Sequence, residues 1–241
     1  MIAVTKTERA AVAKDEPLYL DEEQDLAIPE SALTFDGFCD WACSDDYPEK
    51  ARISWIGEEI FIEMNAEQAN SHVSVKQAFN RVIDHLAVDL DLGVYFPVGV
   101  RIVQSRAKVS NMPDACLINR QAIRDGRVKL RHPKFSDSAS IEGSPDWVLG
   151  ILSRSSIRKD TVVLKERYFK AGVKEYWLVD ARRKERIDFQ IFVRGKSGFV
   201  SQPKTGGWVS SPLFGRRFSL QRRSYEGDFW RFELSVSSSG R

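Results

Sequence analysis

The sequence predicts an α/β protein in which helices cover a central mixed sheet. Three observations lead to this prediction. A helical pattern spans residues 68–90, a buried strand over 147–152 runs into a helical stretch over 153–171, and another strand follows at 175–180. Strand and helix patterns therefore alternate along the chain, as is typical of a sheet that packs against helices.

The composition is that of a folded domain without disulfide or membrane support. Of the 241 residues, 42% are apolar and 29% are charged, which is incompatible with wholesale disorder. Three cysteines are too few for a disulfide scaffold and fit a reducing compartment. No apolar run approaches the roughly 20 residues of a membrane helix, and the first residues lack the apolar region of a signal peptide. We therefore expect a soluble, cytoplasmic protein.

Charge is distributed unevenly along the chain, although the net charge is only +2. Residues 1–50 carry 13 acidic and 4 basic side chains, whereas residues 154–241 carry 20 basic and 9 acidic ones. A basic C-terminal third could lie along a phosphate backbone. It could also be a solvated face, or a face that pairs with the acidic N-terminal segment, and this second interpretation is slightly favoured.

The first half of the chain is predicted to hold a tail, two helices, a hairpin and three further strands. Residues 1–30 are polar, acidic and aperiodic, which predicts a mobile tail before a single domain over residues 31–241. The other elements, in order, are a short helix and loop at 33–43, hairpin strands at 53–56 and 58–64 that turn near Gly57, the helix at 68–90, and strands at 93–96, 98–103 and 116–118. In the long helix, apolar residues recur every three or four positions.

The second half is predicted to contain the core strands. The continuous apolar run at 147–152 is typical of a buried strand. The following helix could be capped by Ser155 or Ser156 and ended by Gly172. After the strand at 175–180, residues 186–193 alternate as in a strand, and the remaining sequence suggests further short strands.

A few residues could carry chemistry, and each has a structural alternative. Asp114, after Pro113, could project from a sheet edge toward a metal, but Pro-Asp is also a common turn. Lys165 and Tyr168 lie three apart on one helix face, where they could be a solvated and a packed side chain. His72 could face a cleft or be a partly exposed residue at a helix start. The spacing of the histidines and cysteines does not match a zinc site.

Together these segments resemble the Uma2 family of restriction-endonuclease-like proteins, from about Leu33 to about Leu220. The resemblance implies the PD-(D/E)XK nuclease fold, a mixed central sheet flanked by helices. The most specific match is Lys165-Glu166-Arg167-Tyr168 followed by Ala171-Gly172-Val173-Lys174-Glu175-Tyr176-Trp177-Leu178-Val179-Asp180. The other matching segments are Ile56-Gly57-Glu58, Glu63-Met64, His72, Pro113-Asp114 and residues 143–153.

The resemblance also implies a site built from an Asp, a Glu on the next core strand and a lysine, with Mg²⁺ or Mn²⁺ as the cofactor, which this chain would hold weakly if at all. Asp114 matches the Asp and would hold the metal. Lys165 is the best match for the lysine, which would orient the attacking water or stabilise charge on the phosphate. His72 and Tyr168 would position the phosphate. The chain departs from the family at Gly150, where the Glu is expected.

The missing carboxylate divides the expected function into alternatives, because Mg²⁺ needs several hard oxygen ligands to act on a phosphodiester. Ile53 also replaces an acidic residue that the family often has. The chain is then either a metal-dependent DNA endonuclease impaired at Gly150, or an inactive relative that binds nucleic acid or a protein partner. Glu63 or Asp160 could substitute as a ligand. A pure interaction protein is a third hypothesis, and a homodimer stays open because nucleases of this fold often pair.

Overall fold

The computed structural model describes most of the chain. The described residues are 2–5, 18–21, 26–48, 51–63, 72–97, 100–131, 140–184, 186–227 and 229–238. Within them, an α/β fold with mixed sheets is present, as the sequence predicts. No helix among the described residues is long and apolar enough to cross a membrane.

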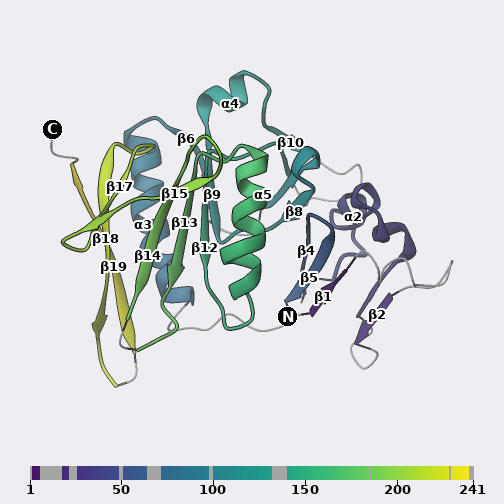
Figure 1. Cartoon of the computed structure of the whole chain (residues 1–241), viewed down its shortest axis with the longest axis horizontal. Coiled ribbons are helices and arrows are strands. Elements are labelled where there is room, and N and C mark those ends of the chain that lie inside the picture. The colour runs from purple at the N-terminus through teal and green to yellow at the C-terminus, as the bar shows by residue number, and fades with distance from the viewer. Residues whose placement is uncertain are drawn as a thin grey trace.

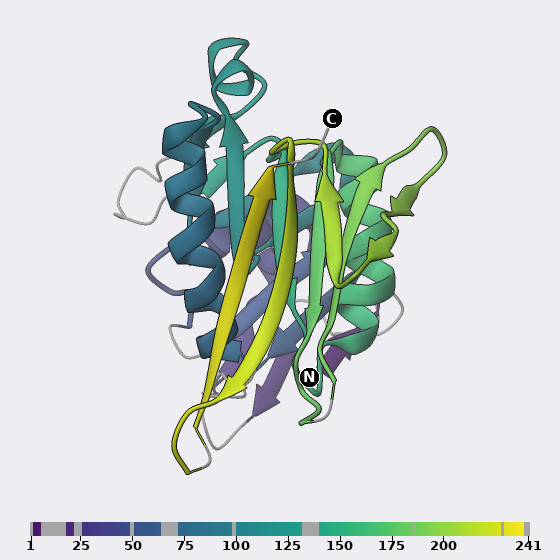
Figure 2. The ribbon, with the colours of Figure 1, turned by 90° about the vertical axis from the view of Figure 1, so that its left-hand side faces the viewer.

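A six-stranded sheet lies at the centre of the described structure (Figures 1 and 2). Its strands, in spatial order, are β15 (Phe199–Ser201), β14 (Asp188–Arg194), β13 (Glu175–Asp180), β12 (Trp147–Ile151), β9 (Ala115–Asn119) and β6 (Gly93–Phe96). β12 and β13 run parallel, whereas β9 and β14 pair with them antiparallel. The parallel pair requires a crossover, which helix α5 (Leu164–Ala171) provides.

The other described strands form three further sheets. The seven-stranded sheet contains β1 (Ile2–Val4), β5 (Glu59–Glu63), β4 (Arg52–Ile56), β8 (Val109–Asn111), β7 (Arg101–Gln104), β11 (Ser140–Glu142) and β10 (Lys129–Arg131). The four-stranded sheet contains β16 (Lys204–Thr205), β17 (Trp208–Ser211), β18 (Arg216–Ser224) and β19 (Trp230–Ser238), and β2 (Leu18–Asp21) pairs with β3 (Leu26–Ile28). The remaining helices are α2 (Phe35–Trp41), α3 (Ser74–Asp89) and α4 (Arg120–Arg124), with 3₁₀ turns at Glu30–Leu33 and Ser105–Ala107.

Most predicted elements lie where the sequence places them. The predicted hairpin is β4 and β5, which turn at Gly57 with a positive φ of 67° that favours glycine. The strands at 93–96, 147–152 and 175–180 are β6, β12 and β13. Helix α3 accounts for the second part of the predicted helix 68–90, whose residues 68–71 lie outside the described structure.

The described part of residues 1–30 contains three short strands. Residues 2–4 pair antiparallel with β5 at the edge of the seven-stranded sheet, and Ile28 of β3 is fully buried. These two segments are therefore packed against the domain. Residues 6–17 and 22–25 of the predicted tail lie outside the described residues, so the division into tail and domain stays a prediction.

The two faces of the central sheet belong to different core clusters because side chains alternate along a strand. Trp147, Leu149 and Trp177 face the cluster that contains α3 and the four-stranded sheet. Val148 and Tyr176 face the opposite cluster, which contains α5 and residues of β5 and β8. Since Gly150 follows Val148 by two positions, it lies on the α5 face, at the end of β12.

The carboxylate of Glu175 joins the four-stranded sheet to the central sheet. It is buried and accepts hydrogen bonds from Trp177 Nε1 (2.8 Å), Ser211 Oγ (2.7 Å) and the Leu213 amide (2.7 Å). Burial raises its pKa, although these three donors oppose the shift. A residue of the predicted strand at 175–180 therefore fixes the turn that follows β17.

Replacing Glu175 with alanine should lower the free energy of unfolding by about 3 kcal/mol, because three donors lose their acceptor in the interior. Glu175→Gln keeps one oxygen and should lose less. Urea unfolding measures both effects, and Glu166→Ala on the exposed face of α5 is the control, with an expected change below about 0.5 kcal/mol. A loss for Glu175→Ala as small as that of the control would contradict this role.

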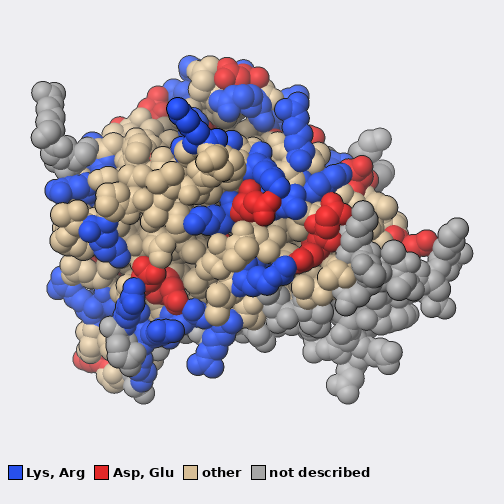
Figure 3. All heavy atoms as spheres, viewed as in Figure 1, with Lys and Arg blue, Asp and Glu red and all other residues tan. Residues whose placement is uncertain are grey.

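Basic side chains of the C-terminal third lie on α5 and on the strands that follow it. Figure 3 shows Lys and Arg gathered at the end of the molecule where β18 turns into β19. Some are neutralised locally: Arg182 pairs with Asp180 at 2.7 Å, and Arg223 pairs with Glu233 at 3.2 Å. Part of the basic third is thus paired within the C-terminal third itself, and these ion pairs do not involve the acidic N-terminal segment.

Candidate functional site

A cavity of about 310 Å³ opens between β12, the start of the α5 helix and the β4–β5 hairpin. Asp114, Gly150, His72 and Tyr168 line it, so four of the five predicted site residues come together there. Its other lining residues are Arg52, Glu63, Asn111, Met112, Pro113, Leu149, Ile151, Leu152, Ser153, Arg154, Ser155, Ser156, Lys159, Asp160, Leu164 and Tyr176. The cavity lies on the face of the central sheet that carries Gly150.

Asp114 is held rigidly at one wall of this cavity. Its amide donates to the Leu149 carbonyl oxygen at 3.1 Å, and its Oδ2 accepts from the Ile151 amide at 2.6 Å. These bonds tie the segment before β9 to the end of β12, one on each side of Gly150. The aspartate is thus hydrogen-bonded to both neighbours of Gly150 on β12.

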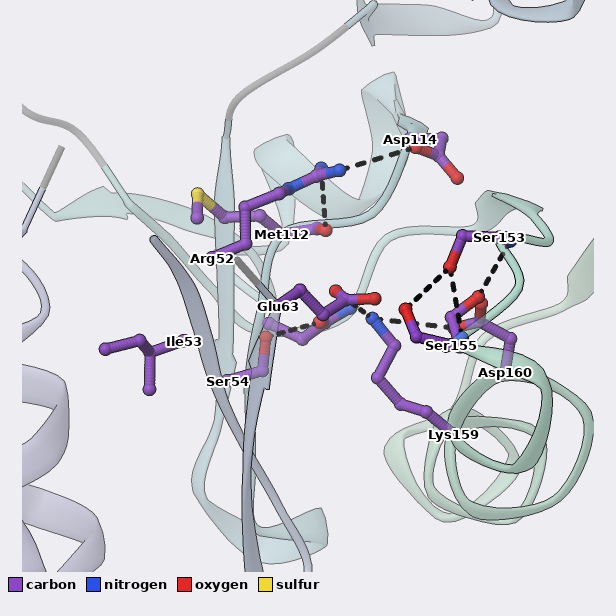
Figure 4. Close-up of polar contacts among 12 residues, drawn as sticks. Arg52, Ile53, Ser54, Glu63, Met112, Asp114, Ser153, Ser155, Lys159 and Asp160 are labelled. Carbon is purple, nitrogen blue, oxygen red and sulfur yellow. Dashed lines mark hydrogen bonds and ion pairs between the residues drawn. The ribbon is translucent and has the colours of Figure 1, made fainter. Parts of the chain in front are cut away.

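Three basic side chains surround the other oxygen of Asp114. His72 Nε2 lies 3.2 Å, Lys76 Nζ 3.5 Å and Arg52 Nη1 3.8 Å from Oδ1, and Figure 4 shows the guanidinium of Arg52 turned toward the carboxylate. His72 and Lys76 are buried. Burial alone would raise the pKa of Asp114, but the hydrogen bond and charge of His72, with the charges of Arg52 and Lys76, hold that pKa well below its usual range.

A second charged cluster lies across the cavity, at the N-terminal part of the helix. Lys159 is buried and its Nζ lies 2.5 Å from Glu63 Oε2 and 3.7 Å from Asp160 Oδ1, as Figure 4 shows. Burial raises the pKa of Asp160 to about 6, against the opposing effects of the Lys159 charge and a hydrogen bond with Ser156. Both candidate substitute carboxylates, Glu63 and Asp160, therefore face the cavity, but each is paired with a lysine.

The raised pKa of Asp160 predicts a dependence of stability on pH. Between about 4, the pKa of an unfolded aspartate, and about 6, the folded state binds more protons at this group than the unfolded state. Stability should therefore fall as pH rises through this window. Asp160→Asn should flatten that fall and be more stable than the native chain at pH 7. Urea unfolding at half-unit pH steps tests this, with exposed Asp84→Asn as the control; equal slopes for native protein and Asp160→Asn would refute it.

Lys165 does not line the cavity, contrary to the prediction. Its Nζ lies over the Phe192 ring, 3.6 Å from the ring centre, and partial burial lowers its pKa. Asp160, Leu164 and Tyr168 follow one another at intervals of four and face the cavity together. Lys165 is one position out of this row, about 100° around the helix. On this helix, Leu164 therefore lies in the row that faces the cavity, where the lysine of the site was expected.

The helix that carries these residues is irregular at its start. Residues 159–163 form a π-helical segment, an arrangement frequent at functional sites. It precedes α5, which ends at Gly172 with a positive φ of 100°, as the sequence predicts. The predicted serine cap is not observed in this form: Ser156 Oγ accepts from the Ser153 amide and Ser153 Oγ accepts from the Ser156 amide, both at 3.0 Å.

Tyr168 is a buried part of a hydrogen-bond chain. Its hydroxyl oxygen accepts from Asn111 Nδ2 at 2.7 Å, and Asn111 Oδ1 accepts from Ser54 Oγ at 2.8 Å. Tyr168 also packs edge-on against Tyr176, with ring centres 5.3 Å apart. Its hydroxyl therefore connects α5 with β8 and β4, and the ring lines the cavity wall.

Gly150 provides the space for the hydroxyl of Tyr176. A Cβ atom at residue 150 would lie 2.7 Å from Tyr176 Oη, so that this hydroxyl would have to move, and 3.3 Å from Leu178 Cδ1, which is a tight contact. Tyr176 is fully buried and donates to the Asp160 carbonyl oxygen at 3.1 Å. The glycine is therefore part of the packing of this wall, in addition to lacking the expected carboxylate.

The residues present do not fit a divalent metal at Asp114. One carboxylate oxygen is hydrogen-bonded to a backbone amide, the other faces Arg52, Lys76 and His72, and position 150 offers no ligand. Among the described residues, no three of His, Cys, Asp and Glu come together in a way that could hold a metal ion. Ile53 points away from the charged groups (Figure 4) and belongs to the core.

Several residues of this site were not singled out by the sequence. Arg52, Lys76 and Lys159 supply its positive charge, and Tyr176 fills the place of the missing side chain. Lys76 follows His72 by four positions on the predicted helix, so the spacing places both on one face. No local pattern connects Arg52 to this face, because the two segments meet only through the fold.

Comparisons with known proteins identify the family. The family model Uma2, described as "Putative restriction endonuclease", matches residues 35–222. A crystal structure described as a "putative nuclease belonging to DUF820" from Anabaena variabilis is similar, with a TM-score of 0.52 and 19% identity, covering 75% of this chain and 90% of that one. No curated protein matches the chain. The similar structure supports the same fold, and the family match spans most of the domain: this chain belongs to the Uma2 family.

Proposed function

We propose that this chain binds nucleic acid at the cavity beside Asp114 without cleaving it. The observation that carries the proposal is the pairing of Asp114, whose carboxylate has Arg52, Lys76, His72 and a backbone amide around it where a nuclease needs a metal ion. The alternative is that the chain is an active endonuclease, and the experiment below distinguishes the two.

Two further features argue against cleavage. Gly150 leaves the core strand without a carboxylate, and a Cβ atom at that position would meet Tyr176 Oη. The amine of Lys165 lies against Phe192, outside the cavity. The cavity therefore lacks the carboxylate that the family has at position 150 of the core strand. It also lacks the amine of Lys165, which would orient a water molecule for attack on phosphorus.

Binding of a phosphate backbone is supported by the chemistry of the cavity rim. Arg154 is exposed there, beside the partly buried hydroxyl-bearing residues Ser153 and Ser155. Arginine and serine side chains are common phosphate contacts in nucleic-acid complexes. Arg52, a third of whose side chain is accessible, adds positive charge on the opposite wall. A nuclease-related fold that keeps such a rim can hold the backbone even where it lacks a metal site.

The test combines cleavage and binding on one substrate. Supercoiled plasmid is incubated with the native chain and Mg²⁺ or Mn²⁺, and a labelled duplex is titrated with the chain at several salt concentrations. We expect no nicked product, together with binding that weakens as salt rises. Arg154→Ala should weaken binding and lower the salt slope by about one ion, whereas Arg124→Ala on α4 should change neither.

Two results would overturn the proposal. Nicking by the native chain that Asp114→Ala abolishes would identify an active nuclease. Absence of any binding to duplex or plasmid would favour a protein that only interacts with other proteins.

A further inference from the structure

We propose that the tip of the β18–β19 hairpin binds single-stranded nucleic acid by base stacking. The tip consists of Arg222, Tyr225, Phe229, Trp230 and Arg231, and lies beyond or at the end of the region that the family model matches. The inference concerns a surface separate from the cavity beside Asp114, so it goes beyond the function proposed above.

The tip carries exposed rings on a hairpin that is anchored elsewhere. Its strand β18 pairs with β17 and β19 packs against α3, whereas Phe229 is 69% exposed and Tyr225 is 55% exposed. The Tyr225 amide donates to the Phe229 carbonyl oxygen and the Phe229 amide donates to the Glu226 carbonyl oxygen, both at 3.0 Å. These backbone hydrogen bonds bring the two ring-bearing residues together at the tip.

Arginines accompany the rings in stacked positions. Arg231 Cζ lies 3.7 Å from the centre of the Tyr225 ring, and Arg222 Cζ lies 4.5 Å from that of Trp230. Arg222 Nη1 also donates to the Arg183 carbonyl oxygen at 2.8 Å, which fixes the guanidinium over the ring. Stacked arginine and aromatic side chains offer a base both a flat surface and a positive charge for the phosphate next to it.

The position of the tip suits an extended nucleic-acid strand. In both ribbon views the hairpin projects past the body of the molecule, at the same end as the connection from β12 to α5 that borders the cavity (Figures 1 and 2). Figure 3 shows Lys and Arg side chains gathered at this end. Single strands are favoured over a duplex because the faces of paired bases are covered by their neighbours, whereas unpaired bases can reach an exposed ring.

Fluorescence anisotropy with a labelled 20-mer of deoxythymidine tests the inference on the full chain. Replacing both Tyr225 and Phe229 with alanine should weaken binding at least about fivefold for each ring, the lower end of what one lost stack produces. Tyr225→Phe should keep near-native affinity. Val88→Ala, at a 73% exposed position on α3, is the matched control and should bind as the native chain does. Thermal melting of each variant confirms that the fold is intact.

The outcomes separate this inference from the proposed function. The alanine variant should bind the duplex of the previous experiment as the native chain does, since the cavity rim is unchanged. Binding of the duplex without binding of the single strand would overturn the inference alone, and the reverse result would overturn the proposed function alone. Equal affinity of the native chain and the alanine variant for the single strand would also refute the stacking site.

Discussion

Replacing Asp114 with asparagine should lower the free energy of unfolding by about 3–5 kcal/mol, the loss typical of removing one partner from a buried charge cluster. The carboxylate of Asp114 is the shared partner of His72, Lys76 and Arg52. Without it, the buried amine of Lys76 would lose its closest described counter-charge. The change also removes a charged acceptor from the Ile151 amide, which ties the segment before β9 to β12.

The same contacts set the pH dependence of the native chain. Because the pKa of Asp114 is held well below its usual range, its contribution to stability is present above the pKa of an unfolded aspartate and is lost as pH falls below about 4. Urea unfolding of native protein and Asp114→Asn at pH 7 and at pH 3 measures both effects, with exposed Asp84→Asn as the matched control. A variant as stable as the native chain would show that the carboxylate serves a function at the expense of stability.

Gly150→Glu should destabilise the chain and should not produce a nuclease. The new Cβ atom would press on Tyr176 Oη, and overpacking of a filled core costs about 1–3 kcal/mol. The added carboxylate would also enter a cavity that Asp114 and Asp160 already line with negative charge. We expect a total loss of about 3 kcal/mol or more, and no nicking of plasmid with Mg²⁺, even when Leu164→Lys supplies an amine on the helix row that faces the cavity.

A double-mutant cycle separates the packing effect from the charge. Gly150→Ala adds only the Cβ atom, and Tyr176→Phe removes only the hydroxyl that this atom would meet. If the contact is responsible, the two changes combined should cost at least about 1 kcal/mol less than the sum of the single changes. Additive effects would show that Gly150 is not needed for the position of Tyr176. Nicking by the Gly150→Glu chain would show that this one glycine inactivates an otherwise complete site.

The sequence predicts the local elements well because their signals are local. Periodic apolar residues define α3, the continuous apolar run 147–151 defines β12, and Gly172 ends α5 with the expected positive φ. The pairing of strands is a different matter. β4 joins β8 and residues 2–4 join β5 across long stretches of chain, and no local pattern encodes such partners.

The candidate site shows the same division. Asp114, His72 and Tyr168 were predicted from motifs, and the structure brings them into one cavity. The resemblance points to Lys165 through the order of residues in a short motif, and that order does not determine the direction of each side chain. The helix face that carries Leu164 lines the cavity, and Lys165 lies on a neighbouring face. The π-helical segment at 159–163 also changes the register of the residues before it.

The charges around Asp114 were beyond sequence reasoning for a similar reason. Arg52 lies on β4 and Lys76 on α3, and both reach the aspartate only after the sheets and the helix have packed. The family pattern predicts where a metal could be held, but not that basic side chains take the places around the carboxylate. Whether this site can hold a metal ion therefore depends on contacts between residues that are far apart in the sequence.

A crystal of the native chain soaked in Mn²⁺ tests the central claim most directly, through anomalous difference density at the cavity. The account predicts no Mn²⁺ peak beside Asp114, with His72, Lys76 and Arg52 still arranged around Oδ1. A peak within about 2.2 Å of the Asp114 carboxylate, with these three side chains displaced, would contradict it.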